Sequence, residues 1–276
     1  MQDRLKEILL KVKKKVFTGN LGNTLTTFKG TGLDFAEIKD YAVGDDVRNI
    51  NWKSTAKGLG VKVNLFNEER ELNIIVAYMV NGSINFGTKR IKQEVMAEIM
   101  GFITYSALKN NDYLTTVFYA DEAMKVYKPT KNLGILEDTL SFALDLDVLG
   151  KKVDYKNFCD FINSRKKQRS LIFVIGDFYD TVDFSSISAK NEVYALIVRD
   201  RFEENPSFLG DVSFVDPVSL DEDSVSLDKS SIKEYVKLIK EHDEKLYEHF
   251  LEQKIKFGKI YTDDDIYIKI SQITRS

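Results

Sequence analysis

The chain has one cysteine and two histidines among its 276 residues. A lone thiol, Cys159, excludes an internal disulfide and is typical of a reducing compartment, so we expect a cytoplasmic protein. Because Cys159 lies in a helical pattern between Phe158 and Phe161, we interpret it as a packed side chain rather than a nucleophile. The histidines, His242 and His249, have no third ligand near them in the sequence, so they do not indicate a zinc site.

The sequence also lacks a long apolar run and an excess of positive charge. No apolar segment approaches the roughly 18 residues that a membrane-spanning helix needs. With 40 basic and 43 acidic residues the formal net charge is −3, which argues against general binding to nucleic acids. An amphipathic helix is expected over 5–16, with its apolar stripe packed on its own domain. The alternative is a helix that lies on an anionic membrane, so membrane contact is expected to be indirect if it occurs.

Two common catalytic signatures are absent from the sequence. There is no Gly-x-Ser-x-Gly elbow of a serine hydrolase. There is also no GxxxxGK[ST] loop of the kind that holds the phosphates of ATP. We therefore expect a protein that is not an enzyme and has no catalytic residues. An enzyme of unknown reaction is the alternative, and no motif supports it.

Apolar segments alternate with helical patterns from residue 72 onward. Apolar runs predict strands at 72–80, 113–120, 170–176, 192–198 and 254–261, and 124–127 is the expected hairpin partner of the second. Helical spacing predicts helices at 89–109, 132–143, 154–166, 229–254 and after residue 263. This alternation predicts an α/β fold, a doubly wound and mostly parallel sheet with helices on both faces.

Loops beyond the carboxyl ends of the strands are the candidate binding surface of such a sheet. Ligands of open α/β sheets bind there, near the point where the strand order reverses. Three loops qualify: NGSINFG at 81–87, KPTKN at 128–132 and GDFYD at 176–180. Function is therefore sought first in these loops.

The segment before residue 72 has a different pattern. Glycines punctuate residues 17–35, which predicts a loop, and alternation at 61–66 predicts a strand. Between them lies YAVGDDVRNINWK, residues 41–53, which contains the only tryptophan of the chain. This stretch does not have the spacing of an amphipathic helix or strand.

The acidic residues and the arginine of this stretch predict a turn that is stabilised by an ion pair. Asp45 and Asp46 lie beside Arg48, and a guanidinium next to two carboxylates favours a bidentate pair. Gly44 is expected to give the turn a positive φ, and Trp52 is expected to pack inward. We interpret the stretch as a structural clamp that also shapes an interface. Direct contact with a partner or ligand is the alternative.

The same stretch and its flanks carry a family signature. A glycine pair, a Tyr-x-x-Gly-Asp-Asp-x-Arg-x-Ile-x-Trp core and a Glu-Glu-Arg entry into the first buried strand resemble a bacterial family catalogued as domain of unknown function 58. The matching residues are Gly30, Gly32, Tyr41, Gly44, Asp45, Asp46, Arg48, Ile50, Trp52, Glu68, Glu69 and Arg70. The resemblance covers essentially the whole chain.

The resemblance implies a fold, a division of the chain and a partner. The fold is von Willebrand factor A-like, at 71–276, and residues 1–70 form an amino-terminal helix and family-motif extension packed on that domain. The implied partner is a MoxR-type AAA+ ATPase with its protein client. The expected role is that of a non-enzymatic adaptor or co-chaperone in the maturation or remodelling of other protein complexes, with no nucleic acid involved.

The resemblance also implies a magnesium site whose residues this chain has altered. Von Willebrand factor A domains often hold Mg²⁺ with an Asp-x-Ser-x-Ser loop, a threonine and a second aspartate. The family spacing places the leading aspartate at Met79, the serines at Asn81 and Ser83, the threonine at Thr130 and the other aspartate at Asp177. A thioether is a poor ligand for a hard cation. We therefore expect no cofactor, and a degenerate site that still binds Mg²⁺ is the alternative function.

Two alternatives concern the same loops, and a third concerns an acidic stretch. A register shifted by two residues would use Asn81, Ser83 and Asn85, but it needs compensating gaps and still supplies no leading aspartate. Asp177 could instead cap a following helical turn. The acidic stretch at 216–228 is expected to be a solvated loop, and the alternative is contact with a basic partner.

Overall fold

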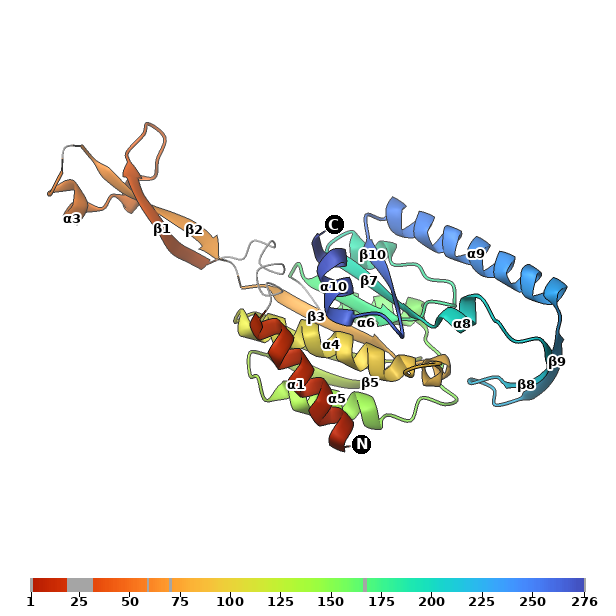
Figure 1. Ribbon diagram of the computed structural model, residues 1–276. Helices are drawn as coiled ribbons and strands as arrows, with labels where there is room; N and C mark the ends of the chain where they lie inside the picture. The colour runs from red at the N-terminus through yellow and green to blue at the C-terminus, as the bar shows by residue number, and fades with distance from the viewer. Residues whose placement is uncertain (1, 19–31, 59, 70, 166–167, 276) are drawn as a thin grey trace. The chain divides into compact units, whose positions relative to one another are not determined.

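The computed structural model describes residues 2–18, 32–58, 60–69, 71–165 and 168–275 (Figure 1). It divides into two compact units, one of Met1–Leu25 with Asn73–Ser276 and one of Thr26–Leu72. The amino-terminal helix, which was predicted to pack on the main domain, belongs to the larger unit. That the family-motif region packs on the main domain stays a prediction.

The larger unit is built on a six-stranded sheet in the order β10-β7-β6-β3-β4-β5. Its strands are β3 (Asn73–Met79), β4 (Tyr113–Tyr119), β5 (Ala123–Thr130), β6 (Leu171–Gly176), β7 (Glu192–Arg199) and β10 (Lys256–Tyr261). All neighbouring pairs are parallel except β4 with β5, which form the predicted hairpin. The predicted fold class is confirmed, and the strand order reverses between β3 and β6.

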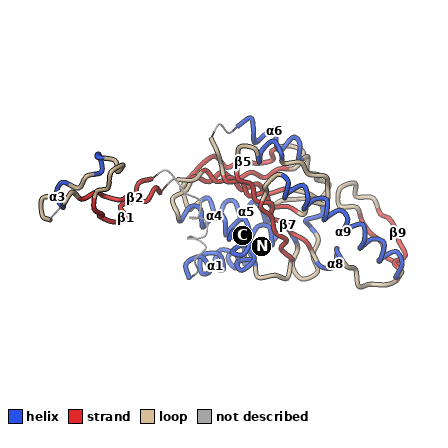
Figure 2. Tube along the Cα trace, turned by 90° about the horizontal axis from the view of Figure 1, so that it is seen from above, coloured by secondary structure: helices blue, strands red, loops and turns tan. Residues whose placement is uncertain are grey.

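Helices cover both faces of this sheet (Figure 2). Contacts place α1 (Gln2–Thr18), α5 (Ile135–Asp145) and α10 (Ile266–Arg275) around α4 (Lys92–Lys109), which lies on β3, β4, β6 and β7. On the other face, α6 (Tyr155–Arg165), α7 (Ser185–Ser188) and α9 (Lys229–Glu252) share one hydrophobic cluster with the strands. Among the described helices, none combines the length and the apolar character needed to cross a membrane.

Helix α1 packs on its own unit, as predicted. Its apolar stripe, Ile8, Val12 and Val16, is at most 6 % exposed. Gly101 on α4 allows a close approach, because a Cβ at Gly101 would lie 3.3 Å from a methyl of Val12. The stripe is therefore used inside the protein, and the alternative of a helix on a membrane surface is not supported.

The acidic stretch at 216–228 forms the turn and the second strand of a hairpin, rather than the predicted loop. Strands β8 (Gly210–Val215) and β9 (Glu222–Leu227) pair antiparallel in a sheet of their own. Asp216 organises the turn, since its carboxylate accepts the amides of Val218 and Ser219 at 2.7 and 2.9 Å. A turn with local hydrogen bonds thus joins two largely exposed strands, whose apolar residues Val212 and Val225 are paired across the hairpin.

The smaller unit is an antiparallel pair, β1 (Gly32–Asp40) with β2 (Lys62–Glu69), which confirms the predicted strand at 61–66. The predicted loop at 17–35 is wrong in its last part, which is β1, and its middle lies outside the described residues. Gly32 pairs with Glu69, so two ends of the family signature are neighbours. Gly30 and Arg70 lie outside the described residues. The 3-10 helix η1 (Val47–Asn49) and the short helix α3 (Trp52–Thr55) connect the strands.

Candidate functional site

Two loops meet at the reversal of strand order, beyond the carboxyl ends of β3 and β6. The first loop begins with the 3-10 helix η2 (Gly82–Asn85), capped by the Asn81 side chain, which accepts the amide of Ser83 at 3.3 Å. The Ser83 hydroxyl donates a hydrogen bond to the Asp177 carboxylate. Asp177 is 1 % exposed. Ser83 and Asp177 are thus in contact, and Asn81 caps the turn that carries Ser83.

A buried lysine completes this cluster. Lys92 is the first residue of α4, and its side chain is fully buried. Its ammonium lies 3.2 Å from the Asp177 carboxylate and 2.5 Å from that of Glu203. It also lies 5.2 Å from the centre of the Tyr179 ring. An ammonium in the interior is costly unless it is paired, and two carboxylates pair this one.

Glu203, on α8 (Arg201–Glu204), is the second carboxylate partner of Lys92. Burial raises the pKa of Glu203, and the nearby Lys92 ammonium opposes that rise without cancelling it. The main-chain carbonyl of Glu203 accepts the Tyr235 hydroxyl from α9 at 2.7 Å. The cluster therefore ties α4, α8 and α9 to the edge of the sheet.

A second buried cation lies beside the first. Arg199, at the end of β7, is fully buried, and its guanidinium carbon lies 3.4 Å from the centre of the Tyr179 ring. It donates to Asp243 on α9 at 3.3 Å. Burial alone would raise the pKa of Asp243, but the Lys259 hydrogen bond at 2.6 Å and the Arg199 charge hold it below the ordinary value. Tyr179 thus lies between two paired cations.

Asp200 joins three loops at the same edge. Its carboxylate accepts the amide of Thr88 at 2.9 Å, the hydroxyl of Thr262 at 2.5 Å and the amide of Phe202 at 2.9 Å. Burial would raise the pKa of Asp200, but these hydrogen bonds lower it. Glu203 completes a capping box by accepting the Asp200 amide at 3.0 Å. The loops before α4, before α8 and after β10 are held by one carboxylate.

Two of the proposed magnesium ligands do not belong to this cluster. Met79 is 1 % exposed and lies in the hydrophobic cluster of the α6 face. Thr130 pairs with Leu114 near the amino end of β4, whereas Met79 pairs with Tyr119 at its carboxyl end. Thr130 is therefore at the opposite edge of the sheet, and its assignment as a ligand is wrong. The strand that carries it is antiparallel, so the loop after it returns to the amino ends.

The donor set does not fit Mg²⁺. Asn81, Ser83 and Asp177 supply one carboxylate, one amide and one hydroxyl, and the carboxylate already binds the Lys92 ammonium. Among the described residues no group of three or more His, Cys, Asp or Glu side chains is arranged to hold a metal. The alternative role of Asp177 as a helix cap is also wrong, because residues 177–179 are not helical.

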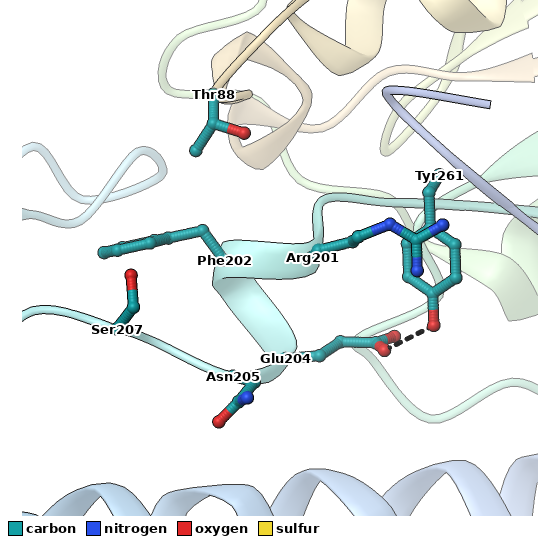
Figure 3. Close-up of a pocket in the computed structure, with 7 residues that line it drawn as sticks. All are labelled: Thr88, Arg201, Phe202, Glu204, Asn205, Ser207 and Tyr261. Atoms are coloured by element: carbon teal, nitrogen blue, oxygen red, sulfur yellow. Dashed lines mark hydrogen bonds between the residues drawn. The ribbon is translucent and has the colours of Figure 1, made fainter.

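An open pocket of about 480 Å³ lies beside α8 (Figure 3). It is lined by Thr88, Arg201, Phe202, Glu204, Asn205, Ser207 and Tyr261. Glu204 accepts the Tyr261 hydroxyl at 2.8 Å and pairs with Lys259 at 2.6 Å. Arg201 pairs with Asp263 at 3.0 Å and lies over the Tyr261 ring. The two charged side chains that line this pocket are thus paired inside the protein.

The family-motif turn is held by two separate ion pairs. Arg48 donates to both carboxylate oxygens of Asp46, with contacts between 2.6 and 3.1 Å, so the predicted pairing is confirmed for Asp46. It is wrong for Asp45, which accepts Lys39 and the Ala42 amide, both at 2.8 Å. These two hydrogen bonds lower the pKa of Asp45. Gly44 has φ +110°, as expected.

The prediction that Trp52 packs inward is wrong, since its side chain is 70 % exposed. Residues 47–55 form two short helical turns, so the alternation expected of an extended segment does not apply. Val43 and Val47 are 101 % and 60 % exposed, and Tyr41 is 38 % exposed. Among residues 38–64 whose side chains are described, Val63 alone is buried. The motif thus presents apolar side chains to its surroundings.

Four residues of this cluster were not predicted from the sequence: Lys92, Arg199, Asp200 and Glu203. The capping pattern Asp-x-x-Glu at 200–203 was a usable signal for a held helix start after a buried strand. No sequence signal separates Lys92 from the other lysines of the chain, because lysine is ordinarily exposed.

Residues 37–245 match the family model described as "Protein of unknown function DUF58". The chain belongs to this family. Curated relatives include the uncharacterized protein Rv1480 of Mycobacterium tuberculosis (strain ATCC 25618 / H37Rv) and Mb1516 of Mycobacterium bovis. Each is 24 % identical over 223 residues, which is 78 % of this chain and 70 % of the relative. The resemblance drawn from the signature residues is confirmed.

Solved structures similar to this DUF58 protein include a von Willebrand factor A domain, that of SpRpn10. It is 10 % identical, with a TM-score of 0.42, over 75 % of this chain and 98 % of that domain. BatB from Bacteroides thetaiotaomicron, described as a conserved hypothetical protein, is 13 % identical, with a TM-score of 0.46, over 73 % of this chain and 96 % of its own.

Proposed function

We propose that this protein is a non-enzymatic interaction module of the cytoplasm, an adaptor or co-chaperone for a MoxR-type AAA+ ATPase and its protein client. The observation that carries the proposal is the exposure of Trp52 within the family-motif turn. Tryptophan is enriched among the residues that dominate binding energy at protein interfaces. The partner class comes from the family resemblance.

The construction of the smaller unit supports a binding role. A two-stranded antiparallel pair is marginally stable alone, so an apolar turn on such a pair gains stability from a partner surface. The Asp46–Arg48 and Asp45–Lys39 pairs fix the turn that carries Val43, so the apolar side chains are presented in a defined arrangement. Prior order of this kind lowers the entropic cost of binding.

The pairing of charges in the larger unit supports a role without catalysis. A catalytic acid or base needs a titratable group within reach of a substrate. In the pocket beside α8, Arg201 and Glu204 are held by Asp263 and Lys259. At the sheet edge, Lys92 and Arg199 are fully buried. These groups stabilise the loops that surround them.

Co-purification with the candidate ATPase tests the proposal. The wild-type protein should be retained by the tagged ATPase in at least one nucleotide state, and Trp52→Ala should weaken binding by about tenfold or more. Leu251→Ala is the matched control, since Leu251 is 68 % exposed on α9 of the other unit. Retention should be unchanged by this control. Absence of wild-type binding in every nucleotide state, or undiminished binding of Trp52→Ala, would contradict the proposal.

A further inference from the structure

Lys92 occupies the position where the fold family would lead one to look for a metal. The loops after β3 and β6 converge at the strand-order reversal, and their side chains Ser83 and Asp177 are in contact. The Lys92 ammonium lies 3.2 Å from the same carboxylate oxygen of Asp177 that accepts the Ser83 hydroxyl. A cation is therefore already present at this edge, attached to the chain.

The surroundings of this ammonium are those of a cation site. Glu203 provides a second carboxylate at 2.5 Å, and the Tyr179 ring faces the ammonium at 5.2 Å. Anionic oxygens and an aromatic face are the groups that stabilise an ammonium away from water. The side chain of Lys92 is fully buried, so these contacts replace its hydration.

The same arrangement disfavours a divalent ion. Mg²⁺ requires near-octahedral oxygen ligands and keeps several waters, so it needs a free carboxylate and space for its shell. Here the carboxylate of Asp177 is 1 % exposed and shared between Ser83 and Lys92. A metal would also meet the like charge of the ammonium at close range.

We propose that the Lys92 ammonium takes the place of the metal ion at the sheet edge, so that this edge is complete without a divalent cation. Three features of the chain then belong together: Met79 where the family spacing puts the anchoring aspartate, the buried Lys92, and Glu203 as its second anion. A chain with an internal cation at this edge has no need of the aspartate that would anchor a metal. The proposal concerns the edge itself and does not depend on any partner.

Mn²⁺ binding followed by electron paramagnetic resonance tests this proposal, with Mg²⁺ as competitor. The wild-type protein should leave Mn²⁺ free at millimolar concentrations. Lys92→Met keeps an unbranched apolar stem but removes the charge, so it should bind Mn²⁺ at least about tenfold more tightly than wild type. Adding Asp177→Asn to that variant should return binding to the wild-type level.

A matched control and a fallback variant keep the outcome decisive. Lys237→Met removes a charge from a lysine whose side chain is 76 % exposed, and it should bind no more Mn²⁺ than wild type. If circular dichroism shows Lys92→Met to be unfolded, the double variant Lys92→Met/Glu203→Gln is measured in its place. This double variant removes one charge of each sign, so it leaves fewer unpaired charges in the interior. Asp177-dependent Mn²⁺ binding by the wild type would overturn the proposal. So would a folded Lys92 variant that gains no affinity.

Discussion

Arg48 donates hydrogen bonds from two guanidinium nitrogens to the carboxylate of Asp46, although only one residue separates Arg48 from Asp46 in the chain. Nη2 lies 2.6 Å from Oδ2, and Nε lies 3.1 and 3.0 Å from the two oxygens. Asp46 also accepts the Arg48 amide at 3.0 Å and caps η1. Side chain and main chain of one residue thus hold the same carboxylate, which makes the family-motif turn a closed local structure.

This pairing predicts the titration of Asp46. The side-chain hydrogen bond from Arg48, followed by the Arg48 amide, lowers the pKa of Asp46 from 3.8 to about 2. A lowered folded-state pKa stabilises the turn above pH 3.8, and that contribution is lost as pH falls through about 2. Carbon-detected NMR should give the low midpoint, and Arg48→Ala should move it toward 3.8. A midpoint unchanged by Arg48→Ala would show that the pair does not set it.

The exposure of Trp52 predicts a solvent-like fluorescence signal. Trp52 is the only tryptophan of the chain, so intrinsic emission reports this one side chain. Because it is 70 % exposed, we expect efficient acrylamide quenching and an emission maximum typical of indole in water. Trp52→Ala should change the free energy of unfolding by no more than about 0.5 kcal/mol. A blue-shifted, protected emission from the isolated protein would instead indicate that the ring is buried.

The four inner strands of the central sheet, β3, β4, β6 and β7, were predictable because they are buried on both faces. The run at 72–80 corresponds to β3 (Asn73–Met79), which is almost entirely buried. The hairpin β8–β9 was not predictable in the same way. Val212 and Phe214 alternate with polar residues on β8, as do Val225 and Leu227 on β9. These strands are largely exposed and the second lies in an acidic stretch, so this short alternation was not interpreted as a hairpin, and the turn at Asp216 connects the two strands. Strand β1 follows a segment rich in glycine, which gave a loop signal that extended too far along the chain.

Replacement of Asp200 is predicted to cause a large loss of stability at the sheet edge. Asp200→Ala would leave the Thr88 and Phe202 amides and the Thr262 hydroxyl without their acceptor. Stranded buried donors cost about 1 to 3 kcal/mol each, and relaxation recovers part of this, so we expect about 3 kcal/mol in total. Urea denaturation measures it. Asp223→Ala, at an exposed position on β9, should stay within about 0.5 kcal/mol of wild type.

The candidate site was predictable only where topology determines it. Asp177 and Ser83 follow neighbouring parallel strands, so their meeting follows from the strand order alone. The assignment of Thr130 as a ligand was wrong because β5 is antiparallel, so the loop after it lies at the other edge of the sheet. Lys92 was not predicted as a site residue for an energetic reason. A buried ammonium exists only where carboxylates from distant segments converge, and the sequence does not show that Asp177 and Glu203 do so.

Gly82 permits the close approach of the β8–β9 turn to the loop after β3. A Cβ at Gly82 would lie 2.0 Å from the carbonyl oxygen of Pro217, a distance that real Cβ contacts essentially never show. The same carbonyl accepts the amide of Gly150 at 2.9 Å. Gly82→Ala should therefore displace the turn and break this hydrogen bond.

That displacement should change both the free energy of unfolding and the hydrogen exchange of one amide. We expect Gly82→Ala to lower the free energy of unfolding by about 1 to 3 kcal/mol, as overpacking does. Hydrogen exchange at Gly150 should accelerate relative to wild type, because its acceptor has moved. Gly58→Ala is the control, since a Cβ there would meet its nearest atom at 3.8 Å, an ordinary contact. Unchanged protection of the Gly150 amide in Gly82→Ala would show that the position of the β8–β9 turn does not depend on its contact with the loop after β3.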